Sequence, residues 1–284
     1  MTVNDLLRSL ELGDHVCCPA DSVRQQWQTA VAGTACGLAR GQKVLFFVPD
    51  PDGLRRHLAA EVTGAARALE RQQIMVNSSD GAYLSKRGFD GEQMLDLVAA
   101  EIDLAERQGF TGLRATGDLS AVARQPRHTE AVLDYEVRLA SIYAGGRITG
   151  ICHYDPGALA ERTWQRVVAA HPSTVQATGQ GAVSRLHAVR TPVGIRVSGG
   201  VGLVNRGAVA SGLAEVAAHP GPCEIDATAL GFADGWAVGC LLRTAGARAA
   251  DGTTIVCSTF LSRALARCGA ASVAGLTVLP GGAQ

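Results

Sequence analysis

Residues 43–48 read KVLFFV and are followed at once by PDP at residues 49–51. A short apolar run that ends in prolines is typical of a strand buried on both faces. The segment before it, residues 22–40, predicts a helix with Ser22 as its N-cap and Gly41 as its C-terminal stop. A helix that leads into a doubly buried strand is the repeating unit of an α/β fold.

The same alternation continues through the first half of the chain. Residues 74–76, 112–116 and 148–154 are further apolar runs that predict strands. Residues 91–108 and 129–143 have apolar side chains at helical spacing and predict helices between those strands. Strands that are apolar on both faces and alternate with helices predict a parallel sheet that helices cover.

The second half of the chain repeats this rhythm on a smaller scale. Residues 171–180 are polar and rich in turn formers, and we place a linker at residues 176–184, between domains at 1–175 and 185–284. Beyond it the sequence predicts strands at residues 186–189, 193–197, 223–226 and 253–257, and helices at 205–218, 235–248 and 259–267. This pattern predicts a small α/β unit with its helices on one side of a mixed sheet.

The composition is that of a globular protein. The 284 residues are 47% hydrophobic and 18% charged, with a net charge of +0. These values exclude a disordered chain and disfavour a protein that binds nucleic acid through a cationic surface. The first residues, MTVNDLLRSLELGDHV, carry charges throughout and predict no signal peptide, and no apolar run is long enough to span a membrane. We therefore expect a cytoplasmic protein without membrane or nucleic-acid partners, whose cysteines are thiols.

The sequence has no phosphate-binding loop of the kind found in nucleoside triphosphatases. The nearest match is GLARGQK at residues 37–43, where Gln42 separates Gly41 from Lys43. The segment also ends a helix and begins a strand, whereas a phosphate loop follows a strand and opens a helix. The GxSxG pattern of a nucleophile elbow is absent as well. We therefore expect no cofactor.

Two stretches combine imidazole, thiol and carboxylate groups. The stretch GDHVCC contains Asp14, His15 and Cys17, and the stretch CHYD contains Cys152 and Tyr154. Imidazole and thiolate groups are zinc ligands, but neither stretch has the paired CxxC spacing of a structural zinc site, and we predict no metal. The alternatives are a polar patch at the mouth of a small-molecule pocket and small side chains buried at strand ends. We take the five named residues as candidate ligand-binding residues.

Asp118 and Tyr135 complete the candidate ligand-binding site. Asp118 follows a predicted strand and so lies at the carboxyl end of the sheet, where open α/β folds bind ligands. The alternative is a turn carboxylate that caps the next segment. Tyr135 and Glu136 lie in the middle of a predicted helix, and we expect Tyr135 in the core and Glu136 in solvent unless it faces a pocket.

Seven short motifs follow one another in the first domain. They are GDHVC at 13–17, GQKVLFFVPD at 41–50, FDGEQML at 89–95, GLRATGDLS at 112–120, LDYE at 133–136, CHYD at 152–155 and HP at 171–172. In this order they resemble the MEDS domain, the methanogen/methylotroph DcmR-like sensory domain, over about residues 8–175. The resemblance implies a parallel sheet of the RecA/KaiC type without a working phosphate loop, and a role in sensing small ligands derived from hydrocarbons.

The second domain carries a further set of motifs. They are VGIRVSG at 193–199, CEIDAT at 223–228 and LGFAD at 230–234. They resemble the STAS domain, the fold of sulfate-transporter domains and anti-sigma-factor antagonists. The resemblance implies a phosphoacceptor Ser or Thr directly after the Phe-x-Asp, but Gly235-Trp236-Ala237 offers no hydroxyl there. Gly202 also stands where the family commonly has an acidic residue.

Asp234, Gly235 and Trp236 are the candidate partner-binding residues. Asp234 is a natural N-cap, because its side chain accepts hydrogen bonds from the free amides of the following helix. Trp236 lies in the first turn of that helix, where it is either an exposed anchor for a partner or docked on the sheet. Since no phosphate can be added at this position, we expect regulation to come from the first domain.

These observations predict a non-enzymatic signalling regulator. In it, a small-molecule sensor domain controls an anti-sigma-factor-antagonist-like module, whose partner is an anti-sigma factor or a related kinase-like protein. The rival hypothesis is a degenerate RecA-like enzyme or nucleotide binder that acts on a small metabolite through Asp14, His15 and Asp118. Those three side chains offer the carboxylate and imidazole groups that acid–base chemistry needs. A third hypothesis is a constitutive scaffold that binds no ligand.

Overall fold

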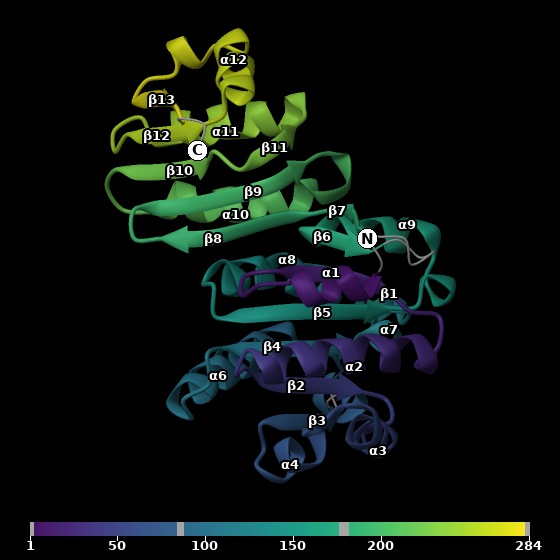
Figure 1. Cartoon of the computed structure of the whole chain (residues 1–284). Coiled ribbons are helices and arrows are strands. Elements are labelled where there is room, and N and C mark those ends of the chain that lie inside the picture. The colour runs from purple at the N-terminus through teal and green to yellow at the C-terminus, as the bar shows by residue number, and fades with distance from the viewer. Residues whose placement is uncertain (1–2, 84–87, 176–181, 282–284) are drawn as a thin grey trace.

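Two β-sheets lie side by side in the computed structural model, which describes residues 3–83, 88–175 and 182–281 (Figure 1). The first sheet contains strands β1 to β7, and the second contains β8 to β13. The chain passes from one sheet to the other between Ser184 and Leu186. The linker expected at residues 176–184 therefore lies partly outside the described residues and partly in β7.

The first sheet is parallel apart from its last strand. Its strands are β1 (His15–Pro19), β2 (Lys43–Val48), β3 (Ile74–Ser78), β4 (Leu113–Asp118), β5 (Ile148–Tyr154), β6 (Ser173–Val175) and β7 (Ala182–Ser184). Their order across the sheet is β3-β2-β4-β5-β1-β6-β7. Strands β1 to β6 pair in parallel, and β7 runs antiparallel to β6. This arrangement confirms the predicted α/β class with a parallel sheet.

Every side chain of β2 and of β5 is buried, and the sequence shows both strands as mainly apolar runs. The sequence does not predict β1 as a strand, since HVCCP places an imidazole and two thiols where aliphatic residues are usual. The strand nevertheless lies between β5 and β6 in the interior of the sheet. Its residues His15 and Cys17 are fully buried there.

Helices cover both faces of the first sheet (Figure 1). They are α1 (Val3–Ser9), α2 (Val23–Ala39), α3 (Pro51–Glu61), α4 (Ala65–Glu70), α5 (Ser79–Tyr83), α6 (Gly91–Arg107), α7 (Ser120–Ala123), α8 (Pro126–Ala144), the 3-10 turn Pro156–Ala158 and α9 (Glu161–Ala170). Apolar side chains of α1 to α4 bury one face of the sheet, here called the α2 face. Those of α6, α8 and α9 bury the other face, here called the α8 face.

Local signals decide where α2 begins and ends. The Ser22 hydroxyl accepts a hydrogen bond from the amide of Gln25 (3.4 Å), which confirms Ser22 as the N-cap. Past the other end, Gly41 has a φ of +68°, a left-handed conformation that glycine adopts without strain. The connection from β1 to α2 consists of Ala20, Asp21 and Ser22. This strand-to-helix turn has neither the glycines nor the lysine of a phosphate loop.

The second sheet is mixed, as predicted. Its strands are β8 (Leu186–Thr191), β9 (Gly194–Val201), β10 (Cys223–Ala227), β11 (Leu230–Ala233), β12 (Thr253–Cys257) and β13 (Leu276–Pro280). The order is β11-β9-β10-β12-β13, and β8 pairs antiparallel with β9. The sequence analysis does not find β11 and β13, because these short outer strands contain Gly231 and Pro280, which favour turns.

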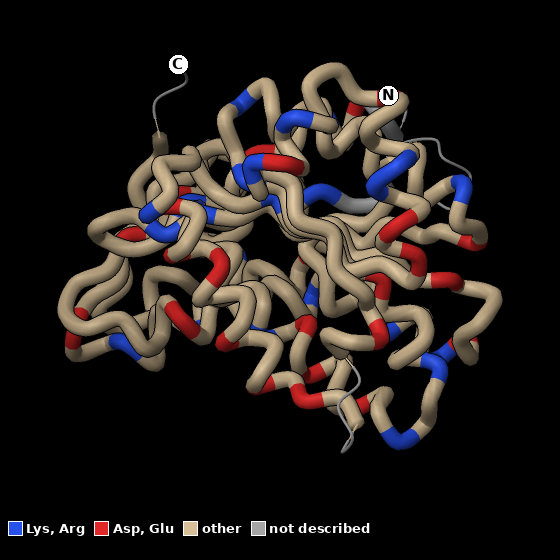
Figure 2. Tube along the Cα trace, turned by 90° about the horizontal axis from the view of Figure 1, so that it is seen from below, with Lys and Arg blue, Asp and Glu red and all other residues tan. Residues whose placement is uncertain are grey.

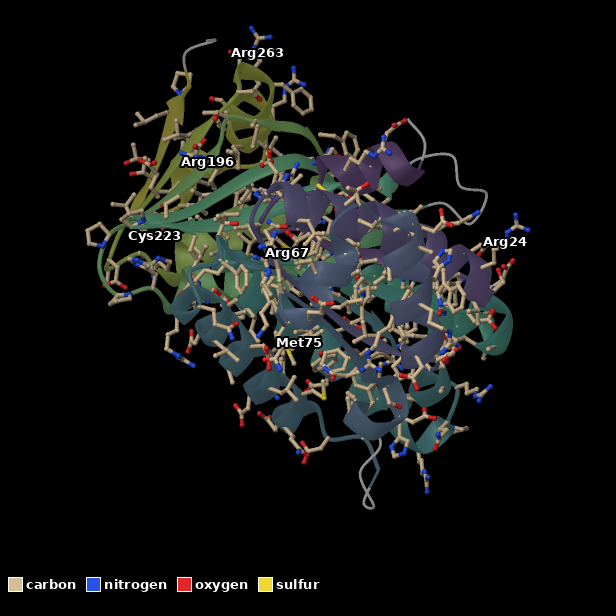
Figure 3. The ribbon with its side chains drawn as sticks, turned by 60° about the horizontal axis from the view of Figure 1, so that its bottom comes forward. Arg24, Arg67, Met75, Arg196, Cys223 and Arg263 are labelled. Atoms are coloured by element: carbon tan, nitrogen blue, oxygen red, sulfur yellow. The ribbon has the colours of Figure 1, made fainter. Side chains whose placement is uncertain are left out.

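Helices cover one face of the second sheet, again as predicted (Figure 1). They are α10 (Arg206–Ala218), α11 (Gly235–Ala247) and α12 (Thr259–Arg267), with 3-10 turns at Leu203–Asn205 and Ala270–Ser272. Buried and partly exposed residues alternate along β10 and β12, as they do in a sheet with one open face. Arg196, labelled in Figure 3, forms an ion pair with Asp226 (2.9 Å) on that open face.

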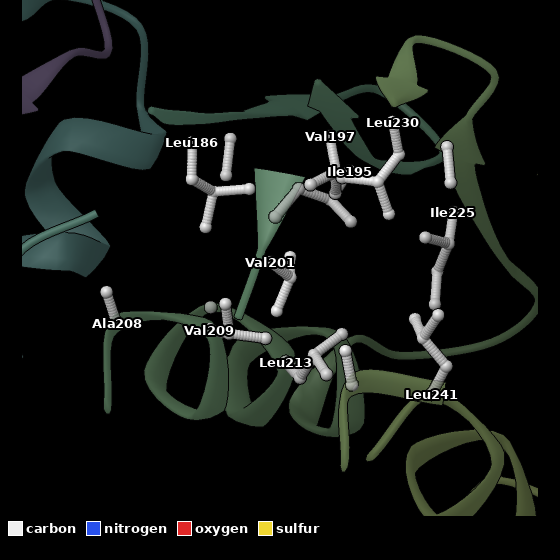
Figure 4. A pocket seen from close by; sticks show the side chains of 14 residues that line it. Leu186, Ile195, Val197, Val201, Ala208, Val209, Leu213, Ile225, Leu230 and Leu241 are labelled. Carbon is white, nitrogen blue, oxygen red and sulfur yellow. The ribbon is translucent and has the colours of Figure 1, made fainter. Parts of the chain in front are cut away.

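A small apolar cavity lies between the second sheet and α10 (Figure 4). Its volume is about 40 Å³, and its lining includes Ile195, Val201, Gly212 and Leu213. An engineered cavity that holds benzene measures about 150 Å³. The void in the second domain is therefore too small for an organic ligand and is a packing defect of the scaffold.

Charged residues of both signs are interspersed over the two domains (Figure 2). Arg24 and Arg263 are exposed and project from separate parts of the surface (Figure 3). Within the described ranges, no helix has both the length and the apolar character needed to cross a membrane.

Candidate functional site

Four side chains that can bind a metal or a polar ligand meet on the α8 face of the first sheet. We call this group the buried cluster, and its members are His15 at the start of β1, Glu136 on α8, Cys152 on β5 and His171 just after α9. Their nitrogen, oxygen and sulfur donor atoms lie within 4.8 Å of one another. All four side chains are buried, and three of them have no exposed surface at all.

The register of two strands brings His15 and Cys152 together. In the parallel pair β1–β5, His15 lies opposite Gly150 and Cys17 lies opposite Cys152. Since side chains alternate along a strand, all of these positions face α8. Gly150 is required here, because a Cβ atom at this position would lie 1.9 Å from the hydroxyl oxygen of Tyr143. The Tyr143 ring stacks on the His15 imidazole, with ring centroids 4.3 Å apart.

Glu136 and His171 are the two members of the cluster that the sequence analysis does not name as ligand-binding candidates. For Glu136 it expects solvent unless the residue faces a pocket, and the side chain is instead fully buried. Glu136 follows Val132 by four residues and precedes Leu139 and Tyr143 by three and seven, and all three of these residues are buried. Residues at this spacing share one face of a helix. The signal that reveals it is therefore an apolar helical face interrupted by one carboxylate.

The Glu136 carboxylate is the centre of the cluster. Its Oε2 atom lies 3.2 Å from Nε2 of His15 and 3.4 Å from Nε2 of His171. Its Oε1 atom accepts a short hydrogen bond from the hydroxyl of Tyr154. Burial raises the pKa of Glu136, but attraction to the protonated forms of His171 and His15 and the hydrogen bonds to the carboxylate outweigh it and lower the pKa to about 2. The carboxylate is therefore ionised at neutral pH.

The His171 imidazole is held in one tautomer. Its Nδ1 atom lies 2.8 Å from the carbonyl oxygen of Val167, and since a carbonyl only accepts, Nδ1 carries the proton. Burial lowers the pKa of His171 from 6.5 to about 4, so the ring is neutral at neutral pH. Nε2 then presents a lone pair to the cluster, and this buried atom has no hydrogen-bond partner.

The candidate ligand-binding residues are buried in the first domain, all seven of them. Of the two alternatives left open by the sequence, burial matches small side chains at strand ends more closely than a polar patch at the mouth of a pocket. His15, Cys152 and Tyr154 come together in or beside the buried cluster, and Cys17 lies next to Cys152 in the strand register. The Tyr135 ring instead packs edge-on against Phe89, with ring centroids 5.6 Å apart.

Asp118 lies on the opposite face of the sheet from the buried cluster. It accepts hydrogen bonds from the side-chain amide of Gln26 on α2 (2.8 Å) and from the backbone amide of Ser120 (2.9 Å). The alternative of a turn carboxylate that caps the next segment is therefore realised. Beside it, Thr29 and His153 form a second buried polar contact, with Oγ1 and Nε2 2.9 Å apart.

Asp14 lies at the boundary between the two domains. Its Oδ1 atom accepts a hydrogen bond from Nδ1 of His187 on β8 (2.9 Å), and its Oδ2 atom accepts one from the amide of Glu11 (2.8 Å). Arg185 approaches the same carboxylate at 3.9 Å. The enzyme hypothesis needs Asp14, His15 and Asp118 to converge, but the fold places them at the domain boundary, in the buried cluster and on the α2 face.

The three candidate partner-binding residues lie where α11 begins. Asp234 accepts a hydrogen bond from the amide of Ala237 (2.9 Å), which confirms it as the N-cap. Its other carboxylate oxygen pairs with Arg206 (2.7 Å), whose guanidinium lies 5.2 Å from the centre of the Trp236 ring. Trp236 is half-buried against the core, and Gly235 is exposed. The tryptophan is thus docked on the domain while part of its surface faces solvent.

Two exposed apolar side chains lie near Asp234 and Arg206 in the sequence. Leu203 and Phe232 have 72% and 56% of their surface exposed. Phe232 packs beside Gly202, the residue that precedes Leu203. Clustered exposed apolar groups mark interaction sites more often than isolated ones do.

Known proteins resemble this chain in two ways. Residues 14–172 match the family model of MEDS, the MEthanogen/methylotroph, DcmR Sensory domain. Among solved structures, the flagellar accessory protein FlaH from Methanocaldococcus jannaschii is similar at 9% identity and a TM-score of 0.41, over 72% of this chain and 85% of that one. A KaiC-like protein from Pyrococcus horikoshii OT3 is similar at 12% identity and a TM-score of 0.41, over 66% and 80%.

No curated protein matches the chain. The family match, however, spans more than half of the sequence and includes every member of the buried cluster. The chain belongs to the MEDS family, and its first domain is a sensory domain of that family.

Proposed function

We propose that this chain is a cytoplasmic signalling regulator. In it, the MEDS domain senses a small molecule, and the second domain changes its affinity for a protein partner in response. Membership of a sensory family supports the first half of this proposal. One observation carries the second half: three members of the buried cluster each have a chain neighbour that is hydrogen-bonded to the second domain.

The three neighbours are Asp14, Val137 and Pro172, which adjoin His15, Glu136 and His171 respectively. The hydrogen bonds run from His187 Nδ1 to Asp14 Oδ1 (2.9 Å), from Ser211 Oγ to the Val137 carbonyl (3.0 Å) and from Asn205 Nδ2 to the Pro172 carbonyl (3.2 Å). A shift of the cluster side chains on ligand binding therefore has three short routes into the second domain.

One of these routes leads to the surface at the start of α11. Asn205 is fully buried and also donates to the carbonyl of Gly200 (2.9 Å), which fixes the loop after β9. The next residue, Arg206, pairs with Asp234 and covers the Trp236 ring. Contacts thus continue without a break from the end of α9 to the candidate partner surface.

The partner that fits this surface is an anti-sigma factor or a related kinase-like protein. The resemblance of the second domain to STAS domains supports this choice, and so do the exposed apolar side chains of Leu203 and Phe232. Because residues 235–237 carry no hydroxyl, the switch in our proposal is conformational and needs no phosphate at this position. A coupling free energy of about 1–3 kcal/mol would change partner affinity about 5- to 150-fold.

The test perturbs the cluster and measures the second domain. Tyr154→Phe removes the hydrogen bond to Glu136 and keeps the ring. We expect it to change amide hydrogen exchange at residues 234–240, at the start of α11. In an Asn205→Ala background the same substitution should have a smaller effect at these amides, because one route is cut.

Thr29→Val is the matched control, since it removes a buried polar contact on the α2 face of the same sheet. It should leave exchange at residues 234–240 unchanged. If Tyr154→Phe also leaves those amides unchanged while it alters exchange around Glu136, the domains are not coupled and the proposal fails.

A further inference from the structure

We propose that the buried cluster binds one divalent transition metal ion of the zinc type through its two imidazoles, its thiolate and its carboxylate. This inference goes beyond the proposed function, because it rests on the geometry of the first domain alone. It replaces the expectation from sequence that the chain has no metal site, which depended on the absence of CxxC spacing.

Four of the six distances between ligand atoms of the cluster are close to those of a tetrahedral site. Zinc bonds of 2.0–2.3 Å at tetrahedral angles separate neighbouring ligand atoms by about 3.3–3.8 Å. Glu136 Oε2 lies 3.2 Å from His15 Nε2, 3.4 Å from His171 Nε2 and 3.7 Å from Cys152 Sγ. His15 Nε2 and Cys152 Sγ are 3.4 Å apart. These four ligand–ligand edges agree with one central ion, and the two edges from His171 Nε2 to His15 Nε2 and to Cys152 Sγ are no longer than 4.8 Å.

The orientation of His171 is the second and independent observation. With its proton on Nδ1 and bonded to Val167, the ring directs the Nε2 lone pair at the Glu136 carboxylate. Two acceptors that face each other at 3.4 Å in a dry core repel, and Nε2 has no other partner. A cation between them turns this repulsion into two bonds. Metal-ligating histidines characteristically donate their second nitrogen to a backbone carbonyl in this way.

The charges of the cluster also fit a dication. Within the described residues, the ion-pair contacts of Glu136 are with imidazoles and include no Lys or Arg. A buried carboxylate without a compensating charge is costly. When Cys152 gives up its thiol proton to solvent and its sulfur bonds the ion, one thiolate and one carboxylate neutralise a 2+ charge. The Tyr154 hydroxyl holds the carboxylate oxygen that remains free and so fixes its direction.

The four protein ligands leave no open position for water or substrate. Closed four-ligand sites are structural, whereas catalytic zinc sites keep one position free. Because the ligands come from β1, β5, α8 and the end of α9, the ion would tie together the elements that contact the second domain. The class of ligand is therefore a tetrahedral divalent metal, with Zn²⁺ the best fit and Co²⁺ its spectroscopic substitute.

The test uses the full chain produced in minimal medium that contains either Zn²⁺ or Co²⁺, so that the ion enters as the protein folds. Elemental analysis of the purified zinc form should find one zinc ion per chain. The cobalt form should show intense visible bands of tetrahedral Co²⁺ and a sulfur-to-cobalt charge-transfer band. Cys152→Ser should abolish the charge-transfer band, and His171→Ala should lower bound metal at least tenfold.

Cys18→Ser is the matched control, because Cys18 adjoins Cys17 on the same strand, is equally buried and faces α2. It should keep both the metal and the spectrum. Glu136→Gln keeps the shape of the side chain, so it serves if Cys152→Ser does not fold, and it should also lower bound metal at least tenfold. Less than stoichiometric metal in the wild-type chain, or a charge-transfer band that survives in Cys152→Ser, overturns the proposal.

Both readouts are taken without a partner and without reference to the second domain. Loss of metal binding would therefore leave the coupling experiment on residues 234–240 to be decided by its own result, and absence of coupling would leave the metal site standing.

Discussion

The cores of the two domains are built in different ways. Among the described residues, the first domain buries Lys43, Arg114 and Glu136 together with several histidines, whereas the second domain buries one guanidinium, that of Arg248, beside an apolar core with a cavity of about 40 Å³. Buried charges cost free energy unless they are paired, and apolar packing does not carry this cost. The proposed roles follow this contrast: ligand chemistry inside the first domain, and partner binding at the surface of the second.

The largest expected effect is a loss of unfolding free energy at acidic pH. The pKa of His171 is about 4 in the folded protein and 6.5 in an ordinary environment, so between these values the unfolded chain binds the extra proton. Stability should therefore fall as the pH drops from 6.5 to 4, by on the order of 3 kcal/mol from this residue. Urea unfolding in the presence of a chelator, followed by hydrogen exchange in the first domain, measures it.

His171→Gln is the control for the acid prediction, and it should flatten the dependence between pH 6.5 and 4.5. Glu136, whose folded pKa is depressed to about 2, adds a loss of the same sign only below pH 4.5. A slope that remains unchanged in His171→Gln would show that the acid-sensitive group lies elsewhere.

Gly150→Ala tests how tightly the polar core is packed. Its new methyl group would meet the buried Tyr143 ring, so we expect a loss of about 2 kcal/mol in unfolding free energy. The displaced ring would also lose its stacking contact with the His15 imidazole. Thermal and urea unfolding measure the loss, and a variant as stable as the wild type would mean that this part of the first core has room to spare.

Trp236→Ala tests whether the second domain acts through its surface. We expect affinity for a purified anti-sigma-type kinase to fall by at least about 1 kcal/mol, or roughly fivefold. Phe260→Ala is the control, because Phe260 is also an exposed aromatic residue of this domain, on α12. Equal losses in both variants would argue against a specific surface at the start of α11, and far-UV circular dichroism checks that each variant folds.

The smallest expected effect is a gain. Gly212 lies within α10 at the edge of the apolar cavity, and a Cβ atom there meets nothing within 4 Å. Gly212→Ala should stabilise the second domain by about 0.5–1 kcal/mol, because alanine loses less backbone entropy in a helix. The chemical denaturation midpoint measures it. A lower midpoint in Gly212→Ala would mean that a methyl group is not tolerated at this position either, although a Cβ atom at Gly150 would meet Tyr143 and one at Gly212 meets nothing.

Much of the fold is legible in the sequence because it depends on neighbours along the chain. The buried strand at residues 43–48, the cap at Ser22 and the cap at Asp234 all follow from a few adjacent residues. The strands that escape prediction are β1, which holds the cluster residue His15, the outer strands β11 and β13, and β6 and β7, which lie in or beside the expected linker. Local sequence patterns predict a strand least well where its residues make contacts with residues far away in the sequence.

The candidate site shows this limit most clearly. The sequence marks His15, Cys152 and Tyr154 as reactive residue types but gives no reason to join them to Glu136 and His171. Only the pairing of β1 with β5 and the packing of α8 and α9 on one face bring these side chains within bonding distance.

The sequence alone thus determined the alternation of strands and helices, the caps, the missing phosphate loop and the missing hydroxyl at the start of α11. These features depend on spacing and residue type over a few positions. The tertiary structure decided which polar groups share one buried space and which of them touch the second domain, because those contacts join separate elements of the chain. The contacts of His15 with Glu136 and Cys152, and of Asp14 with His187, join residues more than a hundred positions apart.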